Sequence, residues 1–424
     1  MNSLIRKFFD LERLRNQKDD APQFNNFFAV TYVAITTIIL AYGTLLGFVS
    51  ILVMYALWLP KIRFKGVWVL KPDTDMPFIF LLPTLAILSV IWSDYPAHSL
   101  YNALEYTSLV LCTIIITRIV RISAFIRGIV IGSTLVLLAS LASNHYETDP
   151  SSGTTFLIGL FGSKNMVGLF AEIGIFLSLL SLYIRQTLIE KILFAIIPLG
   201  IFVASLYTSK SVSSILSLAL VMAAVIVAIF LARIPRTYRM LSLTGIMLLG
   251  IAIAGIGLSL NAHENILEAF GKDTTLTGRT HLWDEGLKIG LQAPYLGHGY
   301  GAFWVEGQPK AEQLWEENGV TAKVGFHFHN VFLETFVELG ALGVAVIVFL
   351  VLANGWNSMR AIIRNGLSVE YIYALGISLM FLARAMVEVD IIGTFSIGPL
   401  LFYSAMPRLA ASPHALNEGG LSGI

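Results

Sequence analysis

The stretch NVFLETFVELGALGVAVIVFLVLA, residues 330–353, is long and apolar enough to cross a lipid bilayer as one helix, since a crossing takes about 20 mostly apolar residues. The whole chain has the same character. Of its 424 residues 56% are hydrophobic and only 13% are charged, which is far from the balance of a soluble domain. We therefore predict an all-α, polytopic membrane protein.

Twelve apolar segments are predicted to cross the membrane, because each approaches the length of a crossing and ends at charged or turn residues. They lie near residues 27–43, 44–60, 76–92, 100–117, 126–143, 163–184, 192–208, 212–232, 240–260, 330–353, 370–388 and 393–407. The first two segments form one apolar run that is broken at Gly43 and Gly47. Basic residues flank this run on both sides, so both flanks are expected in the cytoplasm and the run must cross twice.

The basic residues set the predicted orientation. This topology places 20 of the 28 lysines and arginines on the cytoplasmic side, as the positive-inside rule requires. The predicted division is a cytoplasmic tail at 1–25, transmembrane helices 1 to 9 at 26–260, a periplasmic loop at 261–328, transmembrane helices 10 to 12 at 329–407 and a second cytoplasmic tail at 408–424. A net charge of +1 does not indicate nucleic-acid binding, and the single cysteine, Cys112, excludes an internal disulfide.

The predicted periplasmic loop is where chemistry at the membrane surface is expected. Its net charge is −4, and five of the eight histidines lie in or next to it. The stretch TGRTHLWDEGLKIGL, residues 277–291, predicts a helix in which Arg279 begins a stripe with Trp283, Leu287 and Leu291. The arginine either snorkels along the membrane interface or meets a ligand. Farther on, YLGHGYGAFW, residues 295–304, predicts a flexible turn anchored by its last two aromatic residues.

The stretch FHFHN, residues 326–330, places two histidines before the apolar helix. His329 is expected in or just before the first helical turn, where the helix dipole disfavours positive charge and holds an imidazole neutral, ready to accept a proton. A plain hydrogen-bonded cap is the alternative interpretation. Asn330 is expected to help cap the turn, and Gly340 and Gly343 are expected to allow close helix packing.

Further polar groups fall within the predicted spans. Lys164 and Asn165, in GSKNMVG, are expected either to bind a polar ligand or to hold a helix break. Arg384 and Glu388 are four residues apart, which predicts an ion pair on one helix face or a pair that lines a polar cavity. Asp94 lies in the first outer loop and ranks below His329 as a catalytic group.

Several of these motifs together resemble a known family. His329 and Asn330, then nine residues, Gly340, two residues and Gly343 resemble the signature of the O-antigen ligase and polymerase superfamily, membrane enzymes that move glycans off undecaprenyl diphosphate. The stretches IWSDYPAHSL, GSKNMVG, GRTHLWDEGL and PYLGHGYGAFW resemble parts of its exopolysaccharide polymerase branch, in the same order along the chain. The similarity covers nearly everything from about residue 76 onward.

This resemblance implies metal-independent, inverting glycosyl transfer on the outer face of the bacterial inner membrane, in a fold similar to the lipid-dependent glycosyltransferases called GT-C. It implies that His329 is the catalytic base and that Arg279 binds the substrate diphosphate. Lys210, where relatives usually carry arginine, and Lys164 would assist that binding. The supporting residues are His327, Asn330, Asn165, Tyr300, Arg384 and Glu388. No cofactor and no metal are expected.

The predicted function is a polysaccharide polymerase, which joins lipid-linked repeat units into a longer chain. One alternative is a ligase that passes the glycan to lipid A core or another acceptor. A second is a lipid-linked oligosaccharide flippase or an anion transporter. The expected partners are the undecaprenyl-diphosphate-linked donor and acceptor and the bilayer, with a chain-length regulator or export protein as a further candidate. Nucleic acid is not an expected partner.

Overall fold

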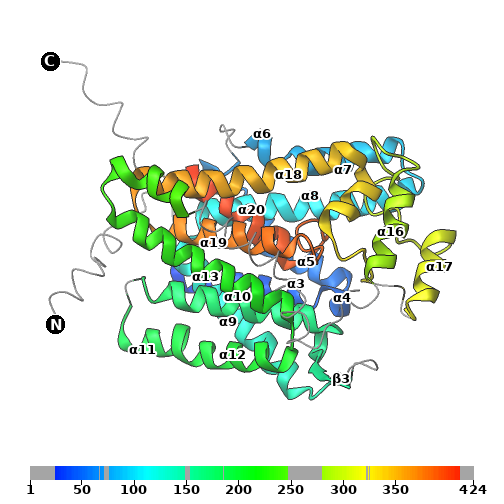
Figure 1. Ribbon diagram of the computed structural model, residues 1–424. Coiled ribbons are helices and arrows are strands. Elements are labelled where there is room, and N and C mark those ends of the chain that lie inside the picture. Colours follow the sequence, from blue (N-terminus) through cyan, green and yellow to red (C-terminus); the bar gives the residue numbers. More distant parts are fainter. Residues whose placement is uncertain are drawn as a thin grey trace.

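The computed structural model describes residues 24–65, 67–70, 76–148, 153–184, 186–246, 279–320, 323 and 325–410. These residues form long helices that lie side by side, with two short antiparallel hairpins (Figure 1). The hairpins pair β1 (Arg63–Phe64) with β2 (Val67–Trp68) and β3 (Tyr146–Thr148) with β4 (Thr155–Leu157). The prediction of an all-α, polytopic membrane protein is confirmed: among the described residues, six helices are long and apolar enough to cross a membrane, with Leu188–Ser209 taken as one helix.

The helices follow the predicted apolar segments closely. In chain order they are α3 (Asn26–Ala41), α4 (Gly43–Leu46), α5 (Phe48–Trp58), α6 (Met76–Ile79), α7 (Leu81–Leu88), α8 (Pro96–Ile119), α9 (Ile122–Ala142), α10 (Lys164–Ser181), α11 (Leu188–Lys191), α12 (Ile197–Ser209), α13 (Val212–Arg233), α16 (Arg279–Gly290), α17 (Pro309–Glu317), α18 (Val331–Asn365), α19 (Val369–Arg384) and α20 (Ile397–Ala410). Residues 236–246 are also helical. The count of twelve spans stays a prediction, because the rest of the ninth segment and almost all of both tails lie outside the described residues.

The first apolar run is broken near Gly43 and Gly47, as predicted, with the one-turn helix α4 between α3 and α5. Helix α3 ends at Ala41, and α5 begins after Gly47, whose backbone has a φ of 53°. This left-handed conformation suits glycine, which has no Cβ to clash. Helices α3 and α5 pack against each other, so the chain reverses direction between them.

Helix α18 is broken at Gly340, which has φ 64° and ψ −164°. The free backbone groups at the break are paired with the connection between α16 and α17. The amides of His298 and Gly299 donate to the carbonyls of Val337 and Glu338. In return, residues 341 and 342 donate to the carbonyls of residues 294 and 295. The first turns of α18 thus form a separate segment that is locked to this connection.

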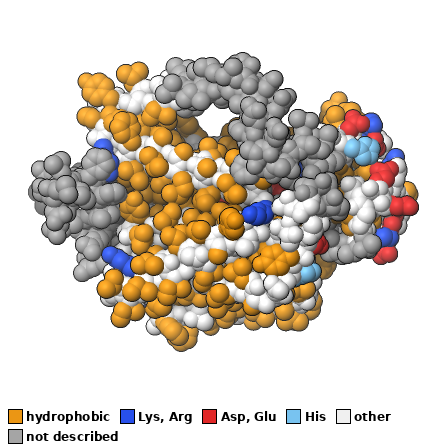
Figure 2. Space-filling view, turned by 60° about the horizontal axis from the view of Figure 1, so that its bottom comes forward, with side chains coloured by type: hydrophobic (Ala, Val, Ile, Leu, Met, Phe, Trp, Pro, Cys, Tyr) orange, Lys and Arg blue, Asp and Glu red, His pale blue; other side chains and the backbone are white. Residues whose placement is uncertain are grey.

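The two ends of the bundle differ in charge. Helices α16 and α17 lie at one end, here called the acidic end, where carboxylates and histidines gather (Figures 1 and 2). Basic residues such as Lys61, Arg118 and Arg239 lie at the opposite end, here called the basic end, and donate to backbone carbonyls there. An apolar surface covers much of the face between the two ends (Figure 2). Such a separation is expected of a membrane protein whose basic residues lie on the cytoplasmic side.

Candidate active site

The site is built around the start of α18, at the acidic end. Asn330 caps this helix: its Oδ1 accepts the amides of Phe332 and Leu333 at 3.0 and 3.1 Å, as predicted. The amide of Val331 donates to the carbonyl of Ala385 at 2.9 Å. The beginning of α18 is therefore tied to the segment that follows α19.

The two histidines lie together just before this cap. His329 has a φ of 52°, a left-handed conformation that is uncommon outside glycine and that occurs often at functional sites. Its amide donates to Nδ1 of His327 at 3.1 Å, and the two rings are 4.2 Å apart between centroids. A neutral His327 must then carry its proton on Nε2. Burial, and next the neighbouring His329, lower the pKa of His327 to about 3, so this ring is neutral at physiological pH.

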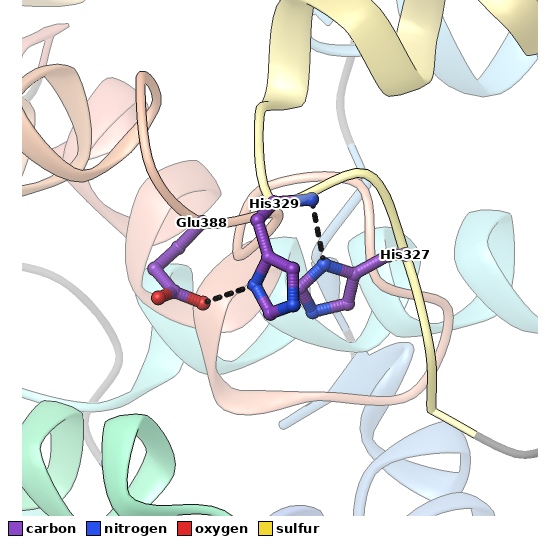
Figure 3. Close-up of side chains that lie close together, drawn as sticks. All are labelled: His327, His329 and Glu388. Carbon is purple, nitrogen blue, oxygen red and sulfur yellow. Dashed lines mark hydrogen bonds and ion pairs between the residues drawn. The ribbon is translucent and has the colours of Figure 1, made fainter. Parts of the chain in front are cut away.

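Glu388 faces His329 from the segment after α19 (Figure 3). Its Oε2 lies 3.7 Å from Nδ1 of His329, and its side chain is only 6% exposed. The other oxygen, Oε1, accepts the side-chain amide of Asn165 at 2.6 Å and lies 3.4 Å from Nη2 of Arg279. One carboxylate oxygen is thus held by two donors, while the second is directed at the histidine.

Arg279 begins α16 and turns into this site. Its Nη1 donates to the carbonyl of Val387 at 2.9 Å, and its side chain remains 20% exposed. The predicted helix is confirmed, but the predicted stripe does not form its buried face, because Leu287 and Leu291 are exposed while Leu282 and Ile289 are buried. The guanidinium contacts protein groups of the polar site, and binding of a ligand by Arg279 stays a prediction.

The predicted ion pair between Arg384 and Glu388 is wrong. Helix α19 ends at Arg384, so four-residue spacing no longer places the two side chains on one helix face. Arg384 instead pairs with Asp390, with Nε and Oδ2 2.6 Å apart, and lies 3.6 Å from the buried Glu172. It also donates to Ser214 at 2.8 Å. Arg384 therefore anchors the segment that carries Glu388.

The two predicted lysines lie at helix ends near Asn165. Lys164 begins α10, with its Nζ 4.0 Å from the ring centroid of Phe156. Lys210 follows the last residue of α12 with a φ of 51° and is exposed, with its Nζ 3.9 Å from the ring centroid of Tyr207. The residue after it, Ser211, is buried and donates to Oδ1 of Asn165 at 3.2 Å. Sequence reasoning missed this serine, although its position beside Lys210 was a signal.

Two of the lower-ranked candidates are engaged elsewhere. Tyr300 is buried, and its hydroxyl donates to the carbonyl of Ile392 at 2.6 Å. Burial raises its pKa well above the usual range, so it is a structural donor at neutral pH. Asp94 lies 2.7 Å from Nδ1 of His298. Both residues support the connection between α16 and α17.

The loop that carries the histidines is fixed by aromatic and acidic groups. The indole of Trp283 donates to the carbonyl of Phe328 at 2.7 Å, and Glu334 accepts both the amide of Phe328 and the indole of Trp304. Trp304 and Phe303 pack against Phe328, so these two residues anchor their turn as predicted. The turn is also paired with the broken α18 by backbone hydrogen bonds, and its predicted flexibility stays a prediction.

Comparison with known proteins identifies the family. A family model described as O-antigen ligase matches residues 197–348. The chain is also 33% identical, over 392 residues, to the exopolysaccharide production protein ExoQ of Rhizobium meliloti strain 1021, an alignment that covers 92% of this chain and 89% of that protein. The chain belongs to the O-antigen ligase family. It is a multi-pass membrane protein related to enzymes of glycan synthesis, and the predicted resemblance is confirmed.

The part matched by the O-antigen ligase model contains Arg279, His327 and His329, but it excludes Asn165 and Glu388. These last two residues reach the site from α10 and from the segment after α19. The site is therefore assembled from inside and outside the matched region.

Proposed function

We propose that this chain is a glycan polymerase, which transfers a glycan from undecaprenyl diphosphate onto the next lipid-linked repeat unit at the periplasmic face. The observation that carries the proposal is the grouping of two side chains around one buried carboxylate, Glu388. His329 is the candidate base, and Arg279 is the candidate hydrogen-bond donor to the substrate diphosphate. The name of the Rhizobium relative, an exopolysaccharide production protein, favours this activity over the other glycan transfers.

In the proposed reaction His329 acts as general base. A proton on Nδ1 faces Glu388, which leaves the lone pair of Nε2 to accept the proton of the attacking hydroxyl. The hydroxyl oxygen forms a bond to the anomeric carbon as the bond from that carbon to the diphosphate breaks, with inversion. The charge of the buried carboxylate, whose Oε2 lies 3.7 Å from Nδ1, stabilises the imidazolium that forms.

Arg279 is proposed to neutralise the leaving diphosphate. A guanidinium offers several donors in a planar fork that suits phosphate oxygens. Part of this fork is occupied by the carbonyl of Val387 and by Glu388, so its orientation is fixed before substrate binds. Such preorganised charge is effective because it need not be reoriented during the reaction. Lys164 and Lys210 would add positive charge, and the whole fold would be similar to GT-C enzymes.

The description of the family model as O-antigen ligase supports a second candidate, transfer of the glycan to a different acceptor. Purified chain in lipid vesicles, supplied with undecaprenyl-diphosphate repeat units and lipid A core from the host and with a chelator, distinguishes the two. A polymerase should produce a ladder of lengthening chains, and this ladder should survive the chelator. Transfer of single units to lipid A core alone would indicate the ligase. Activity that returns only on addition of a divalent metal would contradict the proposed mechanism.

A further inference from the structure

The contacts around His329 leave its Nδ1 without a hydrogen bond among the described residues. This nitrogen is buried. The nearest carboxylate oxygen, Oε2 of Glu388, is 3.7 Å away, which is too far for a hydrogen bond. A buried nitrogen without a partner costs free energy. The gap between this nitrogen and the carboxylate oxygen could therefore hold a group that binds both atoms.

The third side chain beside this gap is His327. One ligand atom from each of His327, His329 and Glu388 can be chosen so that all lie within 4.8 Å of one another (Figure 3). Around a tetrahedral zinc ion with bonds of about 2.1 Å, ligand atoms are roughly 3.4 Å apart. The 3.7 Å between Nδ1 of His329 and Oε2 of Glu388 exceeds this by a few tenths of an ångström, and the other separations, which are at most 4.8 Å, must close by side-chain rotation as well.

The surroundings of Glu388 resemble the outer shell of a metal ligand. Asn165 and Arg279 hold Oε1, so the carboxylate is oriented while Oε2 stays open. Ligands in metal sites are commonly fixed by such outer hydrogen bonds. Two features oppose a cation. One is the positive charge of Arg279, and the other is the hydrogen bond from the amide of His329 to Nδ1 of His327, which must break if that nitrogen is the ligand. The expected affinity is therefore moderate.

We propose that His327, His329 and Glu388 form an inhibitory binding site for a divalent transition-metal ion such as Zn²⁺. Two imidazoles and one carboxylate form a ligand set that such ions favour. A metal on Nδ1 of His329 forces the proton of the neutral ring onto Nε2. That nitrogen then cannot accept a proton from the attacking hydroxyl, so bound metal blocks the reaction. The inhibition rests on the proposed function, whereas the binding does not.

Binding can be measured without any substrate. The full chain, purified in detergent with a tag that contains no histidine, is titrated with Co²⁺, whose visible absorption reports nitrogen and oxygen ligands. The expected result is a band that Zn²⁺ displaces and that Glu388→Gln and His327→Gln weaken at least about tenfold in affinity. His281→Ala is the matched control, because His281 is an exposed histidine that also lies beside a carboxylate, Glu317, and its loss should leave the band unchanged.

The outcomes separate cleanly. A band of unchanged affinity in Glu388→Gln would overturn the site, and so would loss of the band in His281→Ala alone. Should Glu388→Gln fail to fold, the folded His327→Gln variant decides in the same way.

Chain extension is then measured with and without Zn²⁺. Binding without inhibition would refute the inhibitory role, and a chain that binds metal but never extends glycans would contradict the proposed function instead.

Discussion

At the scale of single residues, His327 and His329 differ in what their ring nitrogens can still do. Nδ1 of His327 is occupied by the amide of His329, and its pKa of about 3 makes it a poor proton acceptor. His329 has a carboxylate beside one nitrogen and leaves the other for substrate. The geometry therefore separates a candidate base from a helper.

We expect His329→Ala to lower the rate of chain extension by on the order of 100-fold to 10,000-fold, the usual contribution of a general base. Binding of the lipid-linked donor should be nearly unchanged, since that binding is assigned to Arg279. His327→Ala should lose less activity. The measurement is in vitro chain extension beside donor binding, at matched amounts of folded protein. A greater loss in His327→Ala than in His329→Ala would show that the base has been misassigned.

Arg279 and Lys210 are predicted to respond differently when arginine is replaced by lysine and lysine by arginine. Arg279→Lys should lose most of the activity, because lysine is a compact point charge and lacks the planar fork with which Arg279 contacts Val387 and Glu388. Lys210→Arg should be tolerated, because its side chain is exposed and relatives are expected to carry arginine there. Chain extension by both variants is the test. Near-normal extension by Arg279→Lys would refute the role of the planar fork.

The sequence allowed His329, Arg279 and Asn330 to be singled out, because their motif and their place beside an apolar segment are visible in it. It did not reveal what Glu388 contacts. That residue was assigned to Arg384 by helical spacing, and the spacing fails because α19 ends at Arg384. Contacts between residues more than a hundred positions apart, such as Glu388 with Arg279, depend on how helices pack and leave no local pattern.

At the scale of elements, the break in α18 gives Gly340 a different role from the predicted one of close helix packing. A Cβ added to Gly340 would lie 2.3 Å from the backbone of Tyr295, and its φ and ψ are almost confined to glycine. Hydropathy predicted the apolar segment correctly. The break could not be foreseen, because it depends on pairing with a distant loop.

We expect Gly340→Ala to lower the free energy of unfolding by about 1–3 kcal/mol from its backbone conformation alone, with a further loss from the clash. Chain extension should fall as well, since the segment that carries His329 is fixed by the same contacts. Gly355→Ala is the matched control: Gly355 lies in the same helix with open space around it and should keep or gain stability. Thermal unfolding in detergent measures both. Equal stability of the two variants would contradict this account of the break.

At the scale of the whole molecule, the orientation in the membrane is predicted from the separation of charge between the two ends. The basic end should face the cytoplasm, because positive loops are retained there. The acidic end, with the proposed site, should then face the periplasm. Donors, acceptors and a chain-length regulator would all be met on that side, so the direction of insertion decides whether the proposed function is feasible.

Cysteine labelling tests this orientation, because the native Cys112 is fully buried and should give little background. Glu316→Cys places a thiol on exposed α17 at the acidic end, and Arg236→Cys places one on an exposed helical residue at the basic end. In cells with a permeabilised outer membrane, a maleimide that cannot cross the inner membrane should label the first variant only. Both should react after the inner membrane is dissolved, which controls for accessibility. Labelling of Arg236→Cys alone in whole cells would place the site in the cytoplasm and exclude polymerisation at the periplasmic face.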